Sequence, residues 1–154
     1  MTPKPPIPST PTASQPAEPL DLLRAQMRQP PHNLWMGARA LSADPVARVI
    51  ETELTFRPEM SGREGEAMFH GGIVASFIDL TGHAAVAVWL GGGTTPTIGL
   101  QIDYLAPAIG PRLIARGMLR KAGRAIACAD VEVRAADRLV ALGRGRFSTR
   151  GSNA

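Results

Sequence analysis

Cysteine is almost absent from this chain. The single residue, Cys128, cannot form an intrachain disulfide, so the protein needs no oxidising compartment, and we expect it in the cytoplasm. We interpret Cys128 as a small buried apolar side chain, with a reactive thiol as the alternative. No cysteine pair exists and the histidines at positions 32, 70 and 83 lack the spacing of metal ligands, so no metal site is predicted.

Aromatic residues are also scarce, at 5% of 154 residues, which leaves few side chains that could stack on bases. The net charge of +4 allows an anionic partner. However, the arginine-rich C-terminal half has no zinc-ligand pattern, no aromatic RNA-reading strand motif and no capped basic recognition helix. The sequence therefore predicts no nucleic-acid binding.

A long apolar run of membrane-spanning length is missing. The best run, AAVAVWLGGG, ends in three glycines, whereas a transmembrane helix needs about 20 apolar residues. The opening MTPKPPIPSTPTASQPAEPL is dense in Pro, Ser and Thr and has no signal-peptide core. We therefore expect a soluble protein without a membrane partner, with a disordered tail over 1–20 and one domain over 21–150.

Charged residues are almost absent between positions 67 and 102, where Asp79 is the only Asp, Glu, Lys or Arg. The surrounding segment Gly72–Leu90 is rich in alanine, contains no proline and is apolar nearly all round, which predicts a helix wrapped by the rest of the fold. The glycines at 91–93 end it. An isolated carboxylate in such a helix needs a physical reason.

The remaining elements follow from periodicity and turn residues. Leu20–Gln29 is typical of a short amphipathic helix that packs across one edge of the fold, and 57–68 is typical of a loop. One strand is predicted before the long helix and four after it, in segments 47–56, 96–107, 112–123, 124–135 and 138–149. Gly123 and Ala136-Asp137 read as turns, so we expect the last four strands to form an antiparallel meander.

Three segments in order, HGGIVASFIDLTGHAAV, IDYLAP and LRKAGR, resemble the hotdog-fold acyl-CoA thioesterases of the phenylacetate-pathway (PaaI-like) type, over roughly 48–149. The resemblance implies an α+β fold in which an antiparallel sheet wraps around one long central helix. It also implies hydrolysis of an acyl-CoA thioester without a separate cofactor, since coenzyme A is part of the substrate. A homodimer or homotetramer is expected, with the glycine turn of one subunit facing the carboxylate of another.

The glycine turn of this resemblance, His70-Gly71-Gly72, lies where loop becomes helix. Free amides of the first helical turn and the positive end of the helix dipole favour an anion there. The Gly71 amide could stabilise the oxyanion that forms from a thioester carbonyl, with His70 and Gly72 beside it. The alternative is that the two glycines only make a tight turn.

Asp79 lies about two turns further along the helix. Its apolar neighbours reduce its hydration, which suits it to act as general base on water or as nucleophile at the thioester carbon. The resemblance places a hydroxyl at the start of the next strand, where Thr97 would position the water; an ordinary strand threonine is the alternative. His83 could tune Asp79, line the pocket or be a buried histidine satisfied by backbone.

Two further groups are expected at the rim. Where the resembling family carries Asn or Gln before the glycine turn, this chain has Arg63 and Glu64, so Glu64 could be a second carboxylate base and Arg63 a ligand contact, or both could be plain loop residues. Phosphates of coenzyme A usually meet basic side chains. Arg120, Lys121 and Arg124 could supply them, with a solvated turn as the alternative.

Three classes of function therefore compete. A thioesterase explains Gly71, Asp79, Thr97 and the basic turn together. A hotdog protein that only binds acyl-CoA, as a sensor or carrier, would not need Asp79. A hotdog dehydratase or hydratase would pair a catalytic His with an Asp in a different local motif, which is not found here.

Overall fold

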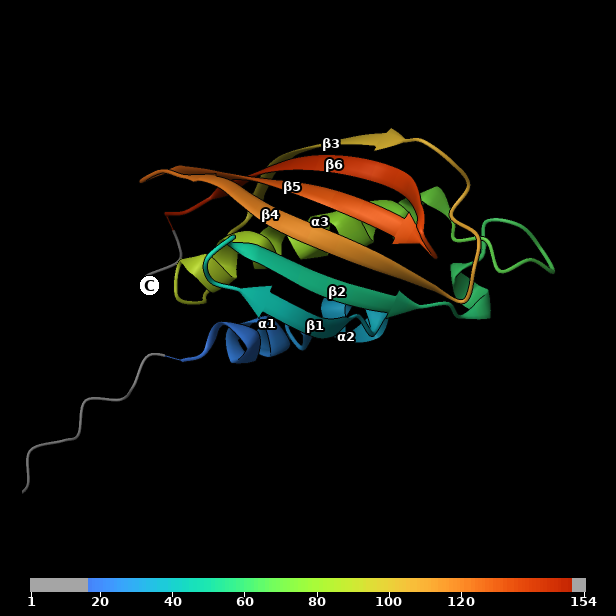
Figure 1. The fold of residues 1–154 in the computed structure, drawn as a ribbon, viewed down its shortest axis with the longest axis horizontal. Helices are drawn as coiled ribbons and strands as arrows, with labels where there is room; N and C mark the ends of the chain where they lie inside the picture. The colour runs from blue at the N-terminus through green and yellow to red at the C-terminus, as the bar shows by residue number, and fades with distance from the viewer. Residues whose placement is uncertain (1–16, 151–154) are drawn as a thin grey trace, which may run out of the picture.

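The N-terminal part of the fold is helical. The structure, a computed structural model, describes residues 17–150, so most of the predicted tail lies outside the described residues. Helix α1 (Pro19–Met27) begins two residues inside that tail, and it packs beside strand β1 at one edge of the sheet, as expected (Figure 1). A second helix, α2 (Pro31–Met36), follows directly and is not indicated by the sequence pattern, because six residues are too few to show a helical period.

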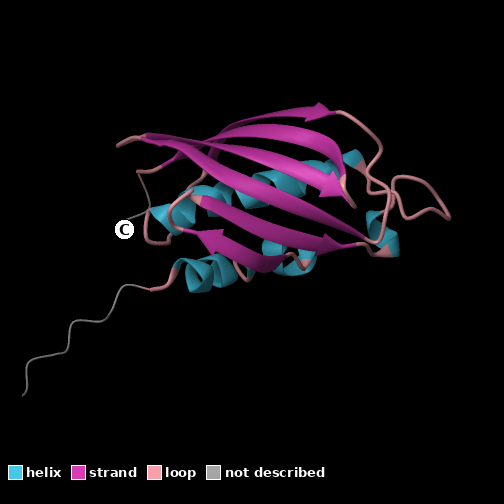
Figure 2. Ribbon diagram, viewed as in Figure 1, coloured by secondary structure: helices cyan, strands magenta, loops and turns pink. Residues whose placement is uncertain are grey.

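One antiparallel sheet forms the body of the protein, and it curves around the long helix α3 (Gly71–Trp89) (Figures 1 and 2). Its strand order is β1-β2-β4-β5-β6-β3. The strands are β1 (Arg39–Asp44), β2 (Val49–Thr55), β3 (Thr97–Tyr104), β4 (Arg112–Ala122), β5 (Ile126–Ala135) and β6 (Arg138–Ser148). This arrangement confirms the predicted α+β fold.

The prediction of a single strand before the long helix is wrong, because β1 precedes β2. Four of the six residues of β1 are exposed and the other two are half-buried, so the strand presents no apolar face for a sequence pattern to reveal. It is an edge strand, paired only with β2. The predicted loop 57–68 contains one short 3-10 turn, η1 (Pro58–Met60).

The predicted meander is confirmed for β4, β5 and β6 but is wrong for β3. Strand β3 pairs with β6 and not, as predicted, with β4. Thr97 lies opposite Phe147, and Tyr104 lies opposite Ala141. Segment 105–111, which joins β3 to β4, carries the chain across the sheet. A turn signal identifies adjacent strands only when the connection is a hairpin, and this connection is a crossover. Strand β3 is consequently the second edge of the sheet.

Helix α3 is the core of the molecule. Eleven of its nineteen residues are buried, and the His70 side chain caps its first turn while Leu90 and three left-handed glycines end it. By length and composition α3 could cross a membrane, but the sheet and α1 cover it, so its apolar character is that of a core helix. Cys128 is not in this core: it is half-buried on β5 between the core residues Ala127 and Ala129, and therefore points to the outer face.

Contact between sheet and helix is close because small residues face α3. A Cβ added to Gly143 of β6 would overlap Cγ2 of Ile78, and one added to Gly82 of α3 would lie 3.0 Å from the Phe147 ring. Between β2 and α3, the buried hydroxyls of Thr52 and Thr81 are hydrogen bonded at 2.8 Å. The two layers therefore have no spare volume at these positions.

We expect Gly143→Ala to lower the free energy of unfolding by about 1–3 kcal/mol, because the added methyl has to displace Ile78 in a packed core. Chemical denaturation of Gly143→Ala, Ile78→Ala and the double variant measures this. The double variant should be less destabilised than the sum of the two single variants, since Ile78→Ala removes the clashing group. Strict additivity would contradict the packing.

Candidate active site

The first turn of α3 carries the glycine motif and is bonded to the edge strand β3. The Nδ1 atom of His70 accepts a hydrogen bond from the Gly72 amide at 2.9 Å. One of the amides expected from the sequence to be free is therefore already hydrogen bonded. The Tyr104 hydroxyl donates to the Gly71 carbonyl oxygen at 2.8 Å. Among the described residues no acceptor meets the Gly71 amide, which lies on the exposed helix end. This amide is the available donor of the turn.

A hollow of 400 Å³ lies beside this turn. It is bordered by Gly71 and Val74 of α3, by Tyr104, and by the segments 68–69 and 105–108. Tyr104 and Leu105 are each about half exposed, at 55% and 51%. Tyr104 belongs to the quoted segment IDYLAP, but its contact with the glycine turn depends on the tertiary fold, so its role is not visible in the sequence.

Asp79 lies eight residues further along α3, which corresponds to about 12 Å along the helix axis. Its carboxylate is half-buried, and Oδ1 accepts a hydrogen bond of 2.8 Å from the hydroxyl of Thr97, the first residue of β3. The structure therefore brings together the predicted carboxylate and the predicted hydroxyl. They border a second hollow of 260 Å³, which Ser76 and Leu80 also line.

The same hollow contains side chains that the sequence reasoning did not single out. Ser76 precedes Asp79 by three residues and so lies on the same helical face, a spacing that could have identified it. Pro30, His32 and Asn33, from α2 and the residue before it, form the far wall. No local pattern indicates that this N-terminal segment reaches the site.

His83 lies one turn after Asp79 and borders the same hollow. Its Nε2 atom accepts a hydrogen bond from the Thr95 amide at 3.2 Å, and its ring meets Phe147 edge-on with centroids 6.4 Å apart. Burial lowers the pKa of His83 below its ordinary value, and the charge of Asp79 opposes this only in part. The imidazole is thus both satisfied by backbone and part of the pocket wall, two of the three readings left open by the sequence.

Glu64 and Arg63 lie in the exposed loop between η1 and α3. Arg63 forms a salt bridge of 3.4 Å with Glu66, and neither Arg63 nor Glu64 borders the hollow at Asp79. Within one chain the structure therefore does not bring Glu64 to Asp79. The predicted roles of both residues stay predictions.

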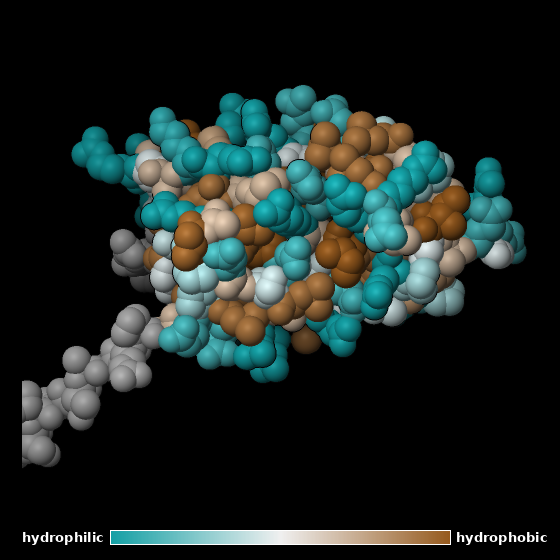
Figure 3. Space-filling model, in the orientation of Figure 1, coloured by the Kyte–Doolittle hydropathy of each residue, from teal (hydrophilic) through white to brown (hydrophobic). Residues whose placement is uncertain are grey.

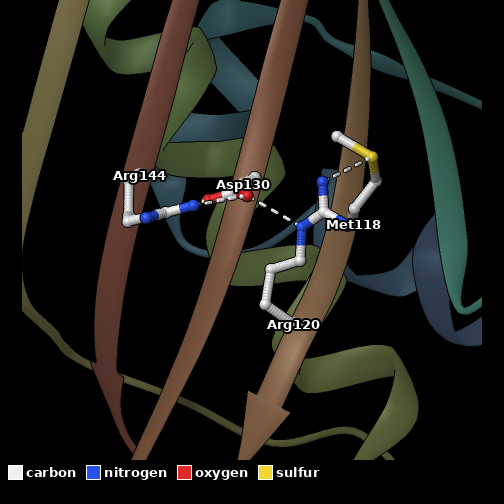
Figure 4. Close-up of polar contacts among 4 residues, drawn as sticks. All are labelled: Met118, Arg120, Asp130 and Arg144. Atoms are coloured by element: carbon white, nitrogen blue, oxygen red, sulfur yellow. Dashed lines mark hydrogen bonds and ion pairs between the residues drawn. The ribbon is translucent and has the colours of Figure 1, made fainter.

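The basic segment near residue 120 divides between strand and turn. Arg120 lies on β4 and donates to Asp130 at 2.7 Å, while Arg144 donates to the same carboxylate from the other side at 2.6 Å (Figure 4). The hydrogen bond from Arg144, and to a smaller extent that from Arg120, keeps the pKa of Asp130 below its usual range, although burial acts to raise it. Lys121 and Arg124 are exposed at the hairpin end. Arg120 is already engaged on the outer face of the sheet, away from α3.

The described residues contain no group of three or more His, Cys, Asp or Glu side chains arranged to hold a metal ion. The chemistry available at the site is that of a carboxylate, a hydroxyl, an imidazole and a backbone amide. Such groups can transfer protons and stabilise an oxyanion.

Comparison with known proteins shows which family this chain resembles. A family model described as the thioesterase superfamily matches residues 67–142. The protein named medium/long-chain acyl-CoA thioesterase YigI is 33% identical over 100 residues in Salmonella typhimurium, covering 54% of this chain and 63% of the relative. The Escherichia coli K12 protein of the same name is equally similar, over 53% of this chain and 63% of its own length. The match thus spans less than two thirds of these curated relatives.

Solved structures show the same architecture over nearly their full length. An X-ray structure of a thioesterase-superfamily protein has a TM-score of 0.79 and 30% identity, covering 86% of this chain and 98% of that one. The Escherichia coli PaaI protein from the phenylacetic acid degradation operon has a TM-score of 0.73 and 22% identity, covering 86% and 94%, and shows the shared fold. The family model matches this chain, and its sheet wraps around α3 as in these solved structures. The chain therefore belongs to the thioesterase superfamily.

Proposed function

We propose that this protein hydrolyses an acyl-CoA thioester to a free acid and coenzyme A. The observation that carries the proposal is the pair formed by Asp79 and Thr97, a half-buried carboxylate held by a hydroxyl at the edge of a hollow in an otherwise uncharged helix. The names of the curated relatives support the same reaction. The single cysteine is compatible with the cytoplasm as the proposed compartment.

Asp79 acts on the thioester carbon in one of two ways. As general base it takes a proton from water while the water oxygen attacks the carbonyl carbon; the C–S bond then breaks and coenzyme A leaves as its thiol. As nucleophile its oxygen bonds to the carbonyl carbon, the C–S bond breaks and coenzyme A leaves as its thiolate; water then hydrolyses the resulting acyl-enzyme anhydride to the free acid and the carboxylate. In both cases the Thr97 hydroxyl keeps one carboxylate oxygen in place, which leaves the other oxygen free to react.

The oxyanion that forms during this reaction needs a donor, and the Gly71 amide is the proposed one. His70 supports it by capping the neighbouring Gly72 amide, which fixes the turn. However, Gly71 and Asp79 of one chain are separated by about 12 Å of helix, too far to act on one carbonyl group. A second copy of the chain has to supply one of the two groups.

The edge strand β3 provides the geometry for this second copy. Thr97 and Tyr104 are its two ends, and each is hydrogen bonded to α3, at Asp79 and Gly71 respectively. Antiparallel pairing of two β3 edges about their midpoint sets Thr97 opposite Tyr104 of the other copy. Asp79 then faces Gly71 of that copy. The exposed Ile98, 54% accessible, and the unpaired edge support such pairing.

We predict that Asp79→Asn lowers kcat on acyl-CoA by about 10²–10⁴-fold, because the isosteric amide keeps the Thr97 contact but cannot act as base or nucleophile. Steady-state hydrolysis over a panel of acyl-CoAs, with binding of each acyl-CoA measured by calorimetry as the control, tests it. A loss below tenfold contradicts the role of Asp79. Binding without hydrolysis by the wild-type protein would instead identify an acyl-CoA-binding protein, the alternative class.

Another prediction concerns the Gly71 amide. Gly71→Pro removes its proton, yet proline suits the first position of a helix and His70 already has the extended backbone, φ −60° and ψ 142°, that a residue before proline requires. We expect a loss of about 10²–10³-fold in kcat. Gly71→Ala keeps the amide and is the matched control, which should lose far less. Equal losses in both variants would show that the amide is not the donor.

Mixing the two inactive variants tests whether the site is shared. If Asp79 of one copy works with Gly71 of the other, dimers that contain one Asp79→Asn and one Gly71→Pro chain hold one intact site of two. Random exchange should then restore about a quarter of the wild-type rate. Sedimentation of the mixture confirms that dimers form. No recovery in exchanged dimers would contradict a site shared between Asp79 of one copy and Gly71 of the other.

A separate prediction follows from the buried imidazole of His83. The pKa of His83 should lie below about 6.5, because burial disfavours its charged form. The unfolded chain, in which His83 has its ordinary pKa of about 6.5, then binds a proton to this ring more readily than the folded chain does. The contribution of the neutral imidazole to stability is therefore complete above about pH 6.5 and is lost as pH falls through the folded pKa. An NMR titration of the ring, assigned with His83→Gln, measures it. A midpoint at or above 6.5 would contradict the buried position.

A further inference from the structure

Two hollows meet at His83. The first, of 260 Å³, contains Asp79 and Thr97, and the second, of 450 Å³, lies between α1 and the segment Gly91–Gly93. Pro30, His83 and Thr94 line both of them. The hollows are therefore neighbours, with the imidazole and Pro30 at their junction, and together they run from the carboxylate toward the C-terminal end of α3.

Side chains are missing from one wall of the second hollow. Gly91, Gly92 and Gly93 all have positive φ, at 85°, 100° and 90°. A Cβ on Gly91 would meet nothing within 4 Å, and a Cβ on Gly92 would lie 3.5 Å from Leu22 of α1. One glycine suffices to end a helix, so the run of three leaves open space that the helix end does not require.

Helix α1 is fixed over this space. The Gln26 side chain donates to the Gly93 carbonyl oxygen at 3.2 Å. From α2, the buried Asn33 amide donates to the carbonyl oxygens of Gln26 and Gln29 at 2.9 and 2.8 Å. The face that α1 turns toward the hollow carries Leu22 and Ala25, while Leu80 and Pro96 add apolar atoms nearer Asp79. The walls thus alternate apolar groups with a few polar ones.

The length of this passage limits what it can hold. Asp79 and Gly91 are twelve residues apart, and α3 spans nearly all of that interval, which amounts to about 18 Å along its axis. A single ring would occupy only the hollow at Asp79. An extended chain fits the direction of the passage and would bury its methylene groups against Leu22, Ala25 and Leu80. On the other side of Asp79, toward β3, the proposed dimer places the oxyanion donor.

Resting on the thioesterase function above, we propose that an unbranched acyl chain lies in this passage, from Asp79 past His83 to the space under α1, and that α1 limits the chain length accepted. His83 is then a specificity-determining residue where the two hollows meet. The residues before the hotdog core, from which the sequence predicts only an edge helix, form the end wall of the acyl site.

The test fills the end of the passage without touching Asp79. Ala25 is exposed on α1 and borders the second hollow, so Ala25→Trp shortens it. Ala47→Trp, in the exposed turn between β1 and β2, is the matched control because it borders neither hollow. The ratio of kcat/KM for palmitoyl-CoA to kcat/KM for butyryl-CoA should fall at least tenfold in Ala25→Trp. It should stay within twofold of wild type in Ala47→Trp.

Binding separates failure of this proposal from failure of the thioesterase function. In Asp79→Asn protein, whose turnover should be slow enough for binding measurements, affinity for acyl-CoA should rise about fourfold for each methylene group until the passage is full. Adding Ala25→Trp should end that rise at a shorter chain. The wild-type protein could fail to hydrolyse any acyl-CoA while the shift in the length limit is still seen. That result would support the acyl passage and contradict the thioesterase function.

Two results overturn the passage. One is an unchanged ratio and an unchanged length limit in Ala25→Trp protein whose thermal unfolding matches wild type. The other is the absence of any dependence of affinity on chain length. If Ala25→Trp fails to fold, Ala25→Leu provides the same test, and a shift in the same direction of smaller size is required.

Discussion

The structure depends on the enclosure of one apolar helix. Each large side chain of α3 that leaves water contributes about 1.5–3 kcal/mol, so α3 is stable only where other elements cover it. The sheet covers it by close approach, which Gly143 and Gly82 permit by leaving room for Ile78 and Phe147. Where the cover ends, groups of α3 become accessible. Gly71 at the first turn and Asp79 on the side toward β3 are two of these places, and both carry the proposed chemistry.

The same enclosure explains why much of the fold follows from the sequence. An apolar, alanine-rich segment ended by glycines indicates α3, and regular alternation indicates β4 to β6, because both patterns reflect burial on a core. Strand β1 and helix α2 escape prediction because they bury little and are short. The place of β3 beside β6 is a property of the crossover and leaves no trace in local residues.

Similar grounds explain which parts of the candidate site the sequence indicates and which it does not. Asp79 is visible because an isolated charge contradicts its surroundings, and Thr97 is found through the resemblance and then lies within 2.8 Å of it. The wall formed by α1 and α2 is invisible, because its contact with α3 joins segments about fifty residues apart. Arg120 is a cation in the sequence, whereas in the fold it is half of a pair with Asp130.

The outer face of the sheet accounts for much of the basic charge. Besides the Asp130 cluster, the buried Glu53 carboxylate lies between Arg39 and Arg112, and polar residues are interspersed with apolar ones over this face (Figure 3). Exposed arginines paired in this way contribute little to stability individually. They do keep this face hydrophilic and balance the charge of the carboxylates. A net positive charge therefore does not by itself locate a phosphate site in this protein.

The bond between Tyr104 and Gly71 ties the edge strand to the start of α3. If two β3 edges pair as proposed, the residue that borders the association surface is also the one that holds the glycine turn. Assembly and donor geometry then become thermodynamically linked: whatever stabilises the pairing also orders the turn, and a substrate that binds the ordered turn strengthens the pairing by the same free energy. Dilution of the protein would in that case weaken substrate binding without altering a single residue of the pocket.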